Sequence, residues 1–232
     1  MSLILNIESA TDICSIAISR ENEIVALREI AGNNHAEKMT LLIMECLEIG
    51  GIKMGDLAAV AISNGPGSYT SLRIGASTAK GICYALDIPL IAVDTLESMA
   101  HAAFKELGDE TALYCPMIDA RRMEVYTAMY QFSKKNNAFE NIEPMNSKII
   151  DADAYSEFLK NKQKIILCGN GSKKIEEIFI NLNIFFSPIV CSARYLSYLS
   201  YRAFVKKEFV NIAYHTPQYL KAPNITMPKK HF

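Results

Sequence analysis

The chain has 232 residues, of which half are hydrophobic and 21% are charged, and its formal net charge is −1. This length suffices for two small domains, or for one domain of two lobes, and the charged fraction is too low for a disordered chain. The balanced charge argues against a protein that holds RNA by itself, because such proteins carry a strongly basic domain. The lysines occur in scattered pairs, which is typical of solvated surface.

The cysteines and histidines predict no metal site. None of the six cysteines is part of a C-x-x-C motif, and the four histidines have no partner at metal-binding spacing. Several cysteines lie in apolar runs, which indicates buried thiols in a reducing compartment. The N-terminus does not read as a signal peptide, and no apolar run approaches the ~20 residues of a membrane span. We therefore expect a soluble cytoplasmic protein without membrane contact.

The first half of the chain alternates strands and helices. A polar turn separates two apolar β-rich runs, and a third strand follows. Asn34, with Glu37 three residues later, predicts a capped helix that Gly50-Gly51 ends. Strand–helix alternation with continuous apolar strands favours a mostly parallel sheet covered by helices. The expected strands are 3–7, 14–19, 24–30, 57–62 and 89–93, and the expected helices are 35–49, 70–86 and 95–107.

The second half restarts in a similar way. Two β-rich runs, 113–119 and 123–130, repeat the pattern of the opening hairpin, with Asp119 at the place of Glu8. We expect lobes at 1–108 and 109–232, with the last helix or tail packing back on the first lobe. The remaining expectations are a polar connection at 132–148, helices at 153–160, 172–181 and within 187–210, a strand at 164–168, and an extended tail from 215.

A Gly-Pro-Gly loop at 65–67 connects a predicted strand to the start of a helix. A helix N-terminus that follows a glycine loop attracts anions, so the loop amides and the nearby hydroxyls are candidates for binding phosphate. No G-K-[ST] follows, which excludes a Walker A loop. A tight turn that needs glycine for its backbone geometry explains the same residues. Acids near predicted element ends either hold Mg²⁺ through water or face solvent, and the sequence does not choose: Glu8, Asp12, Asp94, Glu97 and Asp119.

The helix at 70–86 is rich in small residues and apolar on more than one side, and the helix at 35–49 has Leu41 and Met44 outside its main apolar stripe. Both features indicate burial by a partner chain as well as by the sheet. We expect Ala76→Arg or Ala79→Arg to abolish dimerisation and to leave the monomer folded. The predicted interface residues are His35, Met39, Leu42, Ile43, Cys46, Leu47, Leu72, Arg73, Gly75, Ala76, Ala79 and Cys83.

Three stretches resemble the TsaB (YeaZ) family: ILNIESATDICSIAI near the N-terminus, NGPGSYTSLRIGASTAKGICYALDIPLIAVDTLESMA at 64–100, and IDARRMEVYTAMY at 118–130. The resemblance continues more weakly through GNGSKK and TPQYLK, and so covers most of the chain. It implies an actin/Hsp70-like (ASKHA) two-lobed α/β fold with mixed sheets flanked by helices. It also implies a role in making N6-threonylcarbamoyladenosine next to the tRNA anticodon.

In that family the chemistry belongs to a catalytic paralogue, TsaD, and an ATPase, TsaE, joins the complex. The resemblance implies that this chain pairs with TsaD, or with itself when alone, through the helices that begin near His35 and Thr70. The paralogue carries an H-x-E-x-H metal motif where this sequence reads TLESM at 95–99, with the glutamate alone retained. We therefore expect no independent catalysis, no metal and no tightly bound cofactor. ATP or ADP would bind only in the complex, and tRNA would be contacted only through the complex.

The resemblance also implies phosphate loops at the two hairpins and an adenosine loop at 169–171. The candidate phosphate or nucleotide contacts are Ser9, Thr11, Gly65, Gly67, Ser68, Asp119, Gly169 and Gly171. The first hairpin reads ESAT at 8–11, without the glycine that would let a phosphate approach its backbone. Ser71 and Leu41 replace the glycine and proline usual in the family. Two alternatives stay open: a stand-alone ATPase or metalloprotease-like enzyme, and a protein that binds tRNA directly.

Overall fold

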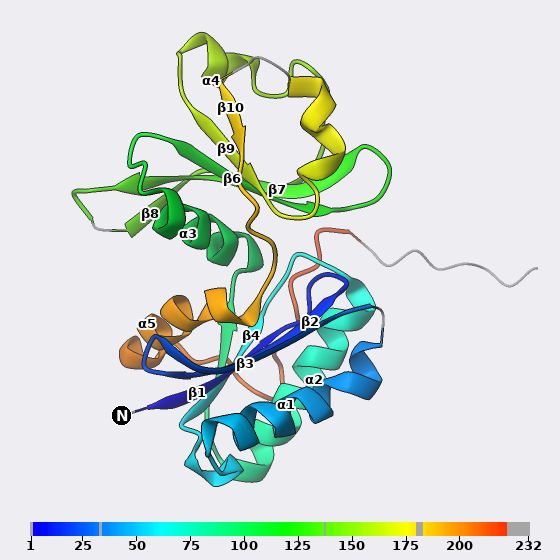
Figure 1. Cartoon of the computed structure of the whole chain (residues 1–232), viewed down its shortest axis with the longest axis vertical. Helices are drawn as coiled ribbons and strands as arrows, with labels where there is room; N and C mark the ends of the chain where they lie inside the picture. The colour runs from blue at the N-terminus through cyan, green and yellow to red at the C-terminus, as the bar shows by residue number, and fades with distance from the viewer. Residues whose placement is uncertain (1, 33, 137, 180–182, 222–232) are drawn as a thin grey trace, which may run out of the picture.

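A computed structural model describes residues 2–32, 34–136, 138–179 and 183–221, which form two five-stranded sheets stacked along the long axis of the molecule (Figure 1). The first sheet contains β1 (Leu3–Glu8), β2 (Ile13–Arg20), β3 (Glu23–Ala31), β4 (Ala59–Ser63) and β5 (Leu90–Val93). The second sheet contains β6 (Leu113–Asp119), β7 (Glu124–Ser133), β8 (Ala138–Ile149), β9 (Ile165–Cys168) and β10 (Ile184–Phe186).

The two sheets have the same topology. Their strand orders are β3-β2-β1-β4-β5 and β8-β7-β6-β9-β10. Each strand of the first sheet therefore corresponds to the strand of the second sheet whose number is higher by five, as β1 does to β6. In both, the first strand pairs antiparallel with the second and parallel with the fourth. The predicted repeat therefore extends from one hairpin to a whole sheet, and the two-lobed actin/Hsp70-like fold is confirmed.

The helices cover the sheets unequally. The α-helices are α1 (His35–Gly50), α2 (Tyr69–Leu86), α3 (Thr95–Leu107), α4 (Ser156–Lys160) and α5 (Ser197–Lys206), and the 3-10 helices are η1 (Met54–Asp56), η2 (Lys173–Phe179) and η3 (Ala193–Leu196). α1 and α2 lie side by side on one face of the first sheet, while η3 and α5 pack on its other face (Figure 1). α3 packs mainly on the second sheet, against β6, β7 and β9. In the described ranges, no helix is long and apolar enough to cross a membrane.

The polar stretch 132–148 is not a connection, as we expected, because most of it forms strands. β8 occupies Ala138–Ile149 and pairs antiparallel with β7, with Phe132 opposite Phe139. β8 is an edge strand with many half-buried or exposed residues, so its asparagines, lysine and glutamates meet water without penalty. Two shorter elements also differ: the described part of the expected helix at 172–181 is the 3-10 helix η2, and the three-residue strand β10 went unrecognised.

Local signals set most helix ends. α1 ends at Gly51, which adopts φ 62° and donates its N–H to Glu48 and Leu47 carbonyls. Asp94 caps α3, because its Oδ1 accepts the N–H groups of Leu96 at 2.8 Å and Glu97 at 2.9 Å. The expected capping box of α1 is not formed, since the Asn34 side chain makes no capping hydrogen bond.

The C-terminal segment, which we define as residues 211–221, joins the two lobes. Val210 first bridges to Leu90 at the free edge of β5. The Gln218 N–H then donates to the Asn64 carbonyl at 2.7 Å, and Lys221 forms an ion pair with Glu124 at the start of β7. The expected extended tail lies outside the described residues beyond position 221.

Candidate functional site

The Gly-Pro-Gly loop packs against the tip of the first hairpin. A Cβ on Gly67 would lie 2.4 Å from the Ala10 carbonyl oxygen, and the Ser68 N–H donates to that same oxygen at 2.7 Å. Gly65 adopts φ 101°, and a Cβ there would lie 2.6 Å from the Gln218 carbonyl oxygen. The glycines therefore permit close contacts between chain segments, and the Ser68 amide, a candidate phosphate donor, is already bonded.

The hydroxyls of the first hairpin are also used within the chain. Ser9 and Thr11 are buried, with 2% and 7% exposure. A Cβ on Gly75 would lie 2.5 Å from Ser9 Oγ, so α2 needs a glycine there to pass the hairpin. Thr11 Oγ1 accepts the Ile13 N–H at 3.4 Å. Neither side chain points into open space that a phosphate would occupy.

The Gly-Asn-Gly loop makes the equivalent contact in the second lobe. Gly169 adopts φ 91°, and its Cβ would lie 2.1 Å from the Met117 carbonyl oxygen. The Gly169 N–H donates to Ile189 at 2.7 Å, and the Gly171 N–H donates to Met117 at 3.1 Å. The Asp119 N–H donates to Asn170 Oδ1 at 3.0 Å. The structure thus brings the candidate residues together as two pairs of loops, each closed by its own hydrogen bonds.

Apolar side chains fill the space where the lobes meet. Ala10 and Leu72 of the first lobe belong to the same buried cluster as Ile118, Cys168 and Ile189 of the second. These side chains join the two lobes in one packed cluster. The loops that the resemblance identifies as phosphate loops therefore act here as packing surfaces between and within the lobes.

Three of the five acids at the element ends have a structural role, whereas the Asp12 side chain is exposed. Asp94 caps α3, Glu97 forms an ion pair with Arg202 of α5 at 3.1 Å, and Asp119 pairs with Lys174 at 2.6 Å. In the described part of the chain, no three His, Cys, Asp or Glu residues come together as a possible metal site. The Mg²⁺ interpretation of these acids therefore gains no support from their positions.

Glu8 differs from the other acids, because its carboxyl group is fully buried at the end of β1. Oε1 accepts the Ala10 N–H at 2.6 Å, whereas Oε2 has no hydrogen-bond partner among the described residues. Burial raises the pKa of Glu8 from 4.5 to about 7, although hydrogen bonds from Ala10, Ser63 and Ser9 oppose the shift. The carboxyl group is therefore partly protonated at neutral pH.

Most of the predicted interface residues point into the core of this chain and not to its surface. Every one of them except Arg73 is buried within the chain itself: His35, Met39, Leu42, Ile43, Cys46, Leu47, Leu72, Gly75, Ala76, Ala79 and Cys83. Most of them pack under α1 and α2 against the first sheet. Their side chains are occupied in the core of this chain, so Arg at Ala76 or Ala79 would disrupt that core.

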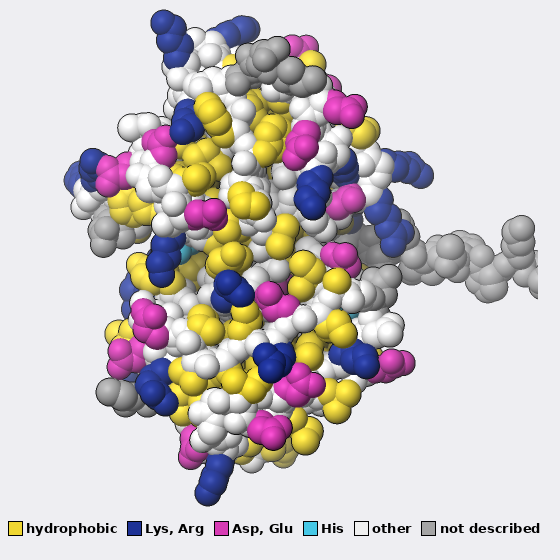
Figure 2. Space-filling view, in the orientation of Figure 1, with side chains coloured by type: hydrophobic (Ala, Val, Ile, Leu, Met, Phe, Trp, Pro, Cys, Tyr) yellow, Lys and Arg dark blue, Asp and Glu magenta, His cyan; other side chains and the backbone are white. Residues whose placement is uncertain are grey.

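The opposite side of α1 and α2 is exposed to solvent. Leu41 and Met44 on α1 are 51% and 64% exposed, and Tyr84 on α2 is 86% exposed. Gly81 lies one helical turn before Tyr84 on the exposed side, and a Cβ built there meets no atom within 4 Å. We call the exposed residues Leu41, Met44, Ser77, Gly81 and Tyr84 the outer face. Figure 2 shows hydrophobic side chains among charged ones over this lower part of the molecule.

Arg73, the exposed member of the predicted interface, contacts the C-terminal segment. Its Nε donates to the Tyr219 hydroxyl at 3.3 Å, and its guanidinium lies 4.4 Å from the centroid of the Tyr69 ring. Tyr219 stacks at a tilt on Tyr69, with 4.7 Å between ring centroids. Lys80 Nζ donates to the His215 carbonyl oxygen at 2.7 Å. The C-terminal segment therefore lies along α2 beside the outer face.

We expect Tyr219→Ala to lower the free energy of unfolding by about 1–2 kcal/mol, because a half-buried aromatic contact and one hydrogen bond are lost. Tyr219→Phe keeps the ring and should lose less than half of that amount. Urea denaturation of both variants measures the difference. Equal stability of the wild type and Tyr219→Ala would show that the C-terminal segment contributes nothing to the fold.

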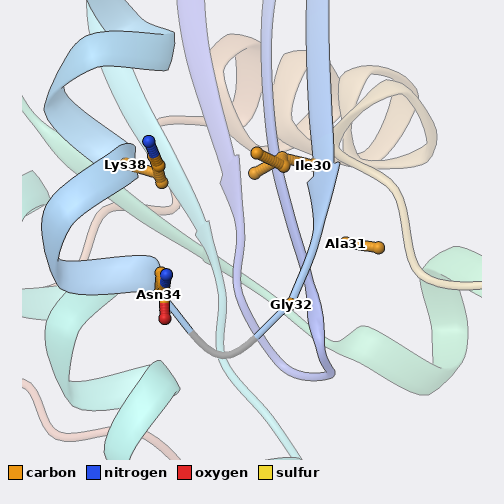
Figure 3. A pocket seen from close by; sticks show the side chains of 5 residues that line it. All are labelled: Ile30, Ala31, Gly32, Asn34 and Lys38. Atoms are coloured by element: carbon orange, nitrogen blue, oxygen red, sulfur yellow. The ribbon is translucent and has the colours of Figure 1, made fainter.

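A shallow pocket of about 200 Å³ opens where β3 gives way to α1 (Figure 3). Its lining residues are Ile30, Ala31, Gly32, Asn34 and Lys38. One cation and one amide line it, without a carboxylate, thiol or imidazole among these five side chains. The pocket therefore lacks the pair of acid and base that catalysis of a hydrolytic or transfer reaction requires.

Comparison with sequence families gives a match over most of the chain. The family described as "TsaD: tRNA N6-adenosine threonylcarbamoyltransferase" matches residues 24–229. The "tRNA threonylcarbamoyladenosine biosynthesis protein TsaB" of Escherichia coli is 36% identical over 128 residues, or 55% of this chain and 54% of that protein. The protein of the same name from Bacillus subtilis is 34% identical over 71% of this chain and 69% of its own length. The chain thus matches just over half the length of the E. coli relative and about two thirds of the B. subtilis relative.

Comparison with solved structures confirms the fold. "YeaZ from Pseudomonas aeruginosa" superposes with a TM-score of 0.77 at 24% identity, covering 95% of this chain and all of that one. Component A of the (R)-2-hydroxyglutaryl-CoA dehydratase of Acidaminococcus fermentans gives a TM-score of 0.53 at 13% identity, covering 90% of this chain and all of that one. The two-lobed architecture, the extent of the family match and the identity to the B. subtilis protein together show that the chain belongs to the TsaB (YeaZ) family.

Proposed function

We propose that this chain is a non-catalytic scaffold subunit, required in the cytoplasm for N6-threonylcarbamoylation of the tRNA adenosine next to the anticodon. It pairs with a TsaD-like catalytic subunit, a TsaE-like ATPase joins them, and the chain forms a homodimer when alone. The names of the relatives supply the class of reaction. The exposed surface of α1 and α2 and the state of the candidate catalytic groups support a non-catalytic role in that reaction.

The outer face of α1 and α2 is the observation that carries the proposal. Leu41, Met44 and Tyr84 are large side chains that are each more than half exposed on adjacent helices. An exposed apolar patch bordered by polar residues is typical of a protein-binding surface. Glycine within a helix costs about 1 kcal/mol, and Gly81 has no neighbour inside the described chain that requires it. Close approach of another backbone explains a small residue at that position.

The state of the candidate catalytic groups supports a scaffold over an enzyme. The amides of Ser68, Gly169 and Gly171 already donate hydrogen bonds within the chain. Burial raises the pKa of Cys14, Cys46 and Cys83 to about 11, so these thiols are not nucleophilic thiolates at neutral pH. A stand-alone ATPase would need the loop amides free to bind phosphate, and a cysteine hydrolase would need an accessible thiolate.

A reconstituted modification assay tests the proposal. Purified TsaD-like subunit, TsaE-like ATPase, tRNA and threonylcarbamoyl-adenylate are combined with and without this chain. We expect formation of the modified nucleoside to depend on the chain, and the chain alone to have no activity. Full activity without the chain, or activity of the chain alone, would contradict the proposal and favour a stand-alone enzyme.

A further inference from the structure

The turn between β6 and β7 carries two arginines in an unfavourable backbone conformation. Arg121 adopts φ 71° and Arg122 adopts φ 51°, and both residues are exposed. Left-handed backbone costs an L residue roughly 1–2 kcal/mol, and hairpin turns of this hand normally use Asn or Gly. Glycine at either position would remove the strain. Strained, exposed residues whose side chains make no hydrogen bond or ion pair among the described residues point to a function outside the fold.

Lys174 of η2, in the same lobe, fixes the backbone of this turn. Its Nζ donates to Asp119 Oδ1 at 2.6 Å and to the carbonyl oxygen of Arg122 at 2.8 Å. The same Asp119 oxygen accepts the Arg121 N–H at 2.7 Å. One lysine thus fixes the turn and also neutralises the carboxylate that precedes the two arginines in sequence.

The guanidinium groups of the turn have no acidic partner in the part of the chain that the structure describes. Neither Arg121 nor Arg122 forms an ion pair within 4.0 Å there, and neither side chain donates a hydrogen bond. Glu124, the next acid along the chain, is paired with Lys221 of the C-terminal segment. Both neighbouring carboxylates are therefore neutralised by lysines, and the two arginine charges are uncompensated at the turn.

We propose that the Arg121–Arg122 turn binds phosphate groups of an RNA backbone, so that this chain supplies part of the tRNA-binding surface of the complex. The inference rests on the proposed function. A guanidinium offers a planar fork of N–H donors that matches two phosphate oxygens, and a fixed turn presents two such forks at low entropic cost. The formal net charge of −1 is no obstacle, because backbone binding requires a local excess of positive charge.

The turn is also placed where a large ligand can reach it. It lies on the side of the second lobe where the C-terminal segment ends, since Lys221 contacts Glu124 at the base of the turn (Figure 1). In Figure 2 several Lys and Arg side chains lie on that side of the upper lobe, with Asp and Glu side chains among them. The outer face belongs to α1 and α2 of the other lobe, so a partner bound there leaves the turn accessible.

The double variant Arg121→Gly/Arg122→Gly tests the proposal without breaking the turn, because glycine adopts positive φ readily. We expect its thermal stability to equal or exceed that of the wild type. The readout is fluorescence anisotropy of labelled tRNA titrated with the assembled complex at several salt concentrations. Losing two phosphate contacts should raise Kd about tenfold and lower the slope of log Kd against log salt by about 1–2.

Lys206→Gln/Lys207→Gly is the matched control. It removes two positive charges at the end of α5 in the first lobe, and Lys207 also has a positive φ of 58°. We expect this control to bind tRNA as the wild type does. An unchanged Kd for the arginine variant, or the same rise in Kd for the control, would overturn the proposal.

Two co-elution results distinguish RNA binding at the turn from protein binding there, and from a failure of the proposed function. If the arginine variant fails to co-elute with the catalytic subunit, the turn binds a protein partner and the RNA proposal is wrong. If the wild-type chain does not assemble with the catalytic subunit at all, the proposed function itself has failed. Wild-type assembly with unchanged tRNA binding by the arginine variant rejects this inference alone.

Discussion

Gly81→Arg is expected to abolish association with partner chains while the monomer stays folded. A side chain at Gly81 points into open space, so the substitution removes a poor helix former and strains nothing inside the chain. In the assembled state, the same arginine would separate two closely packed surfaces. We expect partner affinity to fall by about 100-fold or more, as for other residues at the centre of an interface.

Ala79→Arg, two residues earlier on α2, serves as the contrast. Ala79 is completely buried in the core between α2 and the first sheet, so an arginine there either buries a charge or opens the core. We expect a loss of more than about 4 kcal/mol in the free energy of unfolding. This replaces the expectation from sequence that Ala79→Arg would spare the monomer.

Size-exclusion chromatography with the catalytic subunit and thermal melting together distinguish the two variants. The expected pattern is a folded Gly81→Arg monomer that does not co-elute and an unfolded or insoluble Ala79→Arg protein. A Gly81→Arg chain that still co-elutes would place the partner elsewhere than the outer face. A stable Ala79→Arg chain would contradict the packing of α2 on the sheet.

Glu8→Gln is expected to stabilise the protein above neutral pH. In the folded state the pKa of Glu8 is about 7 because its carboxyl group is buried, whereas the unfolded value is 4.5. Between these two values the unfolded chain releases the proton and the folded chain keeps it, so stability falls as pH rises. The full pKa shift corresponds to about 3 kcal/mol in the free energy of unfolding. This contribution is fully present at about pH 4 and is lost by about pH 8.

Urea denaturation at about pH 4, 6 and 8 checks this prediction. The glutamine side chain stays neutral, so the stability of the variant relative to the wild type should rise between pH 4.5 and about 7. Burial raises the pKa of Asp94 to about 6, which lowers stability as pH rises, and lowers the pKa of His101 to about 4, which has the opposite effect. Both contributions are the same in the two proteins, so the difference between the two profiles measures Glu8. Glu21→Gln, at the exposed turn after β2, is the control and should keep the wild-type profile. Parallel profiles for Glu8→Gln and the wild type would mean that the carboxyl group is ionised inside the fold.

The sequence determined the family, the two-lobed fold and the order of elements in the first lobe. Alternating apolar runs and the Gly51 stop are local signals, and they placed α1, α2 and α3 to within about two residues. The pattern at 113–130 correctly indicated a repeat of the opening hairpin. β8 escaped recognition because an edge strand carries polar residues that water solvates, and these resemble a loop.

Only the tertiary structure decided which side of α1 and α2 packs on the sheet and which side is exposed to a partner. A helical pattern shows that Ala79 and Gly81 lie on different sides of α2, but both are small, so the pattern does not tell which side meets the sheet. The same limit applies to Gly67, where a glycine beside a phosphate and a glycine beside the Ala10 carbonyl look identical in sequence. Burial and close approach are properties of chain segments far apart in sequence, so they appear only when the fold brings those segments together.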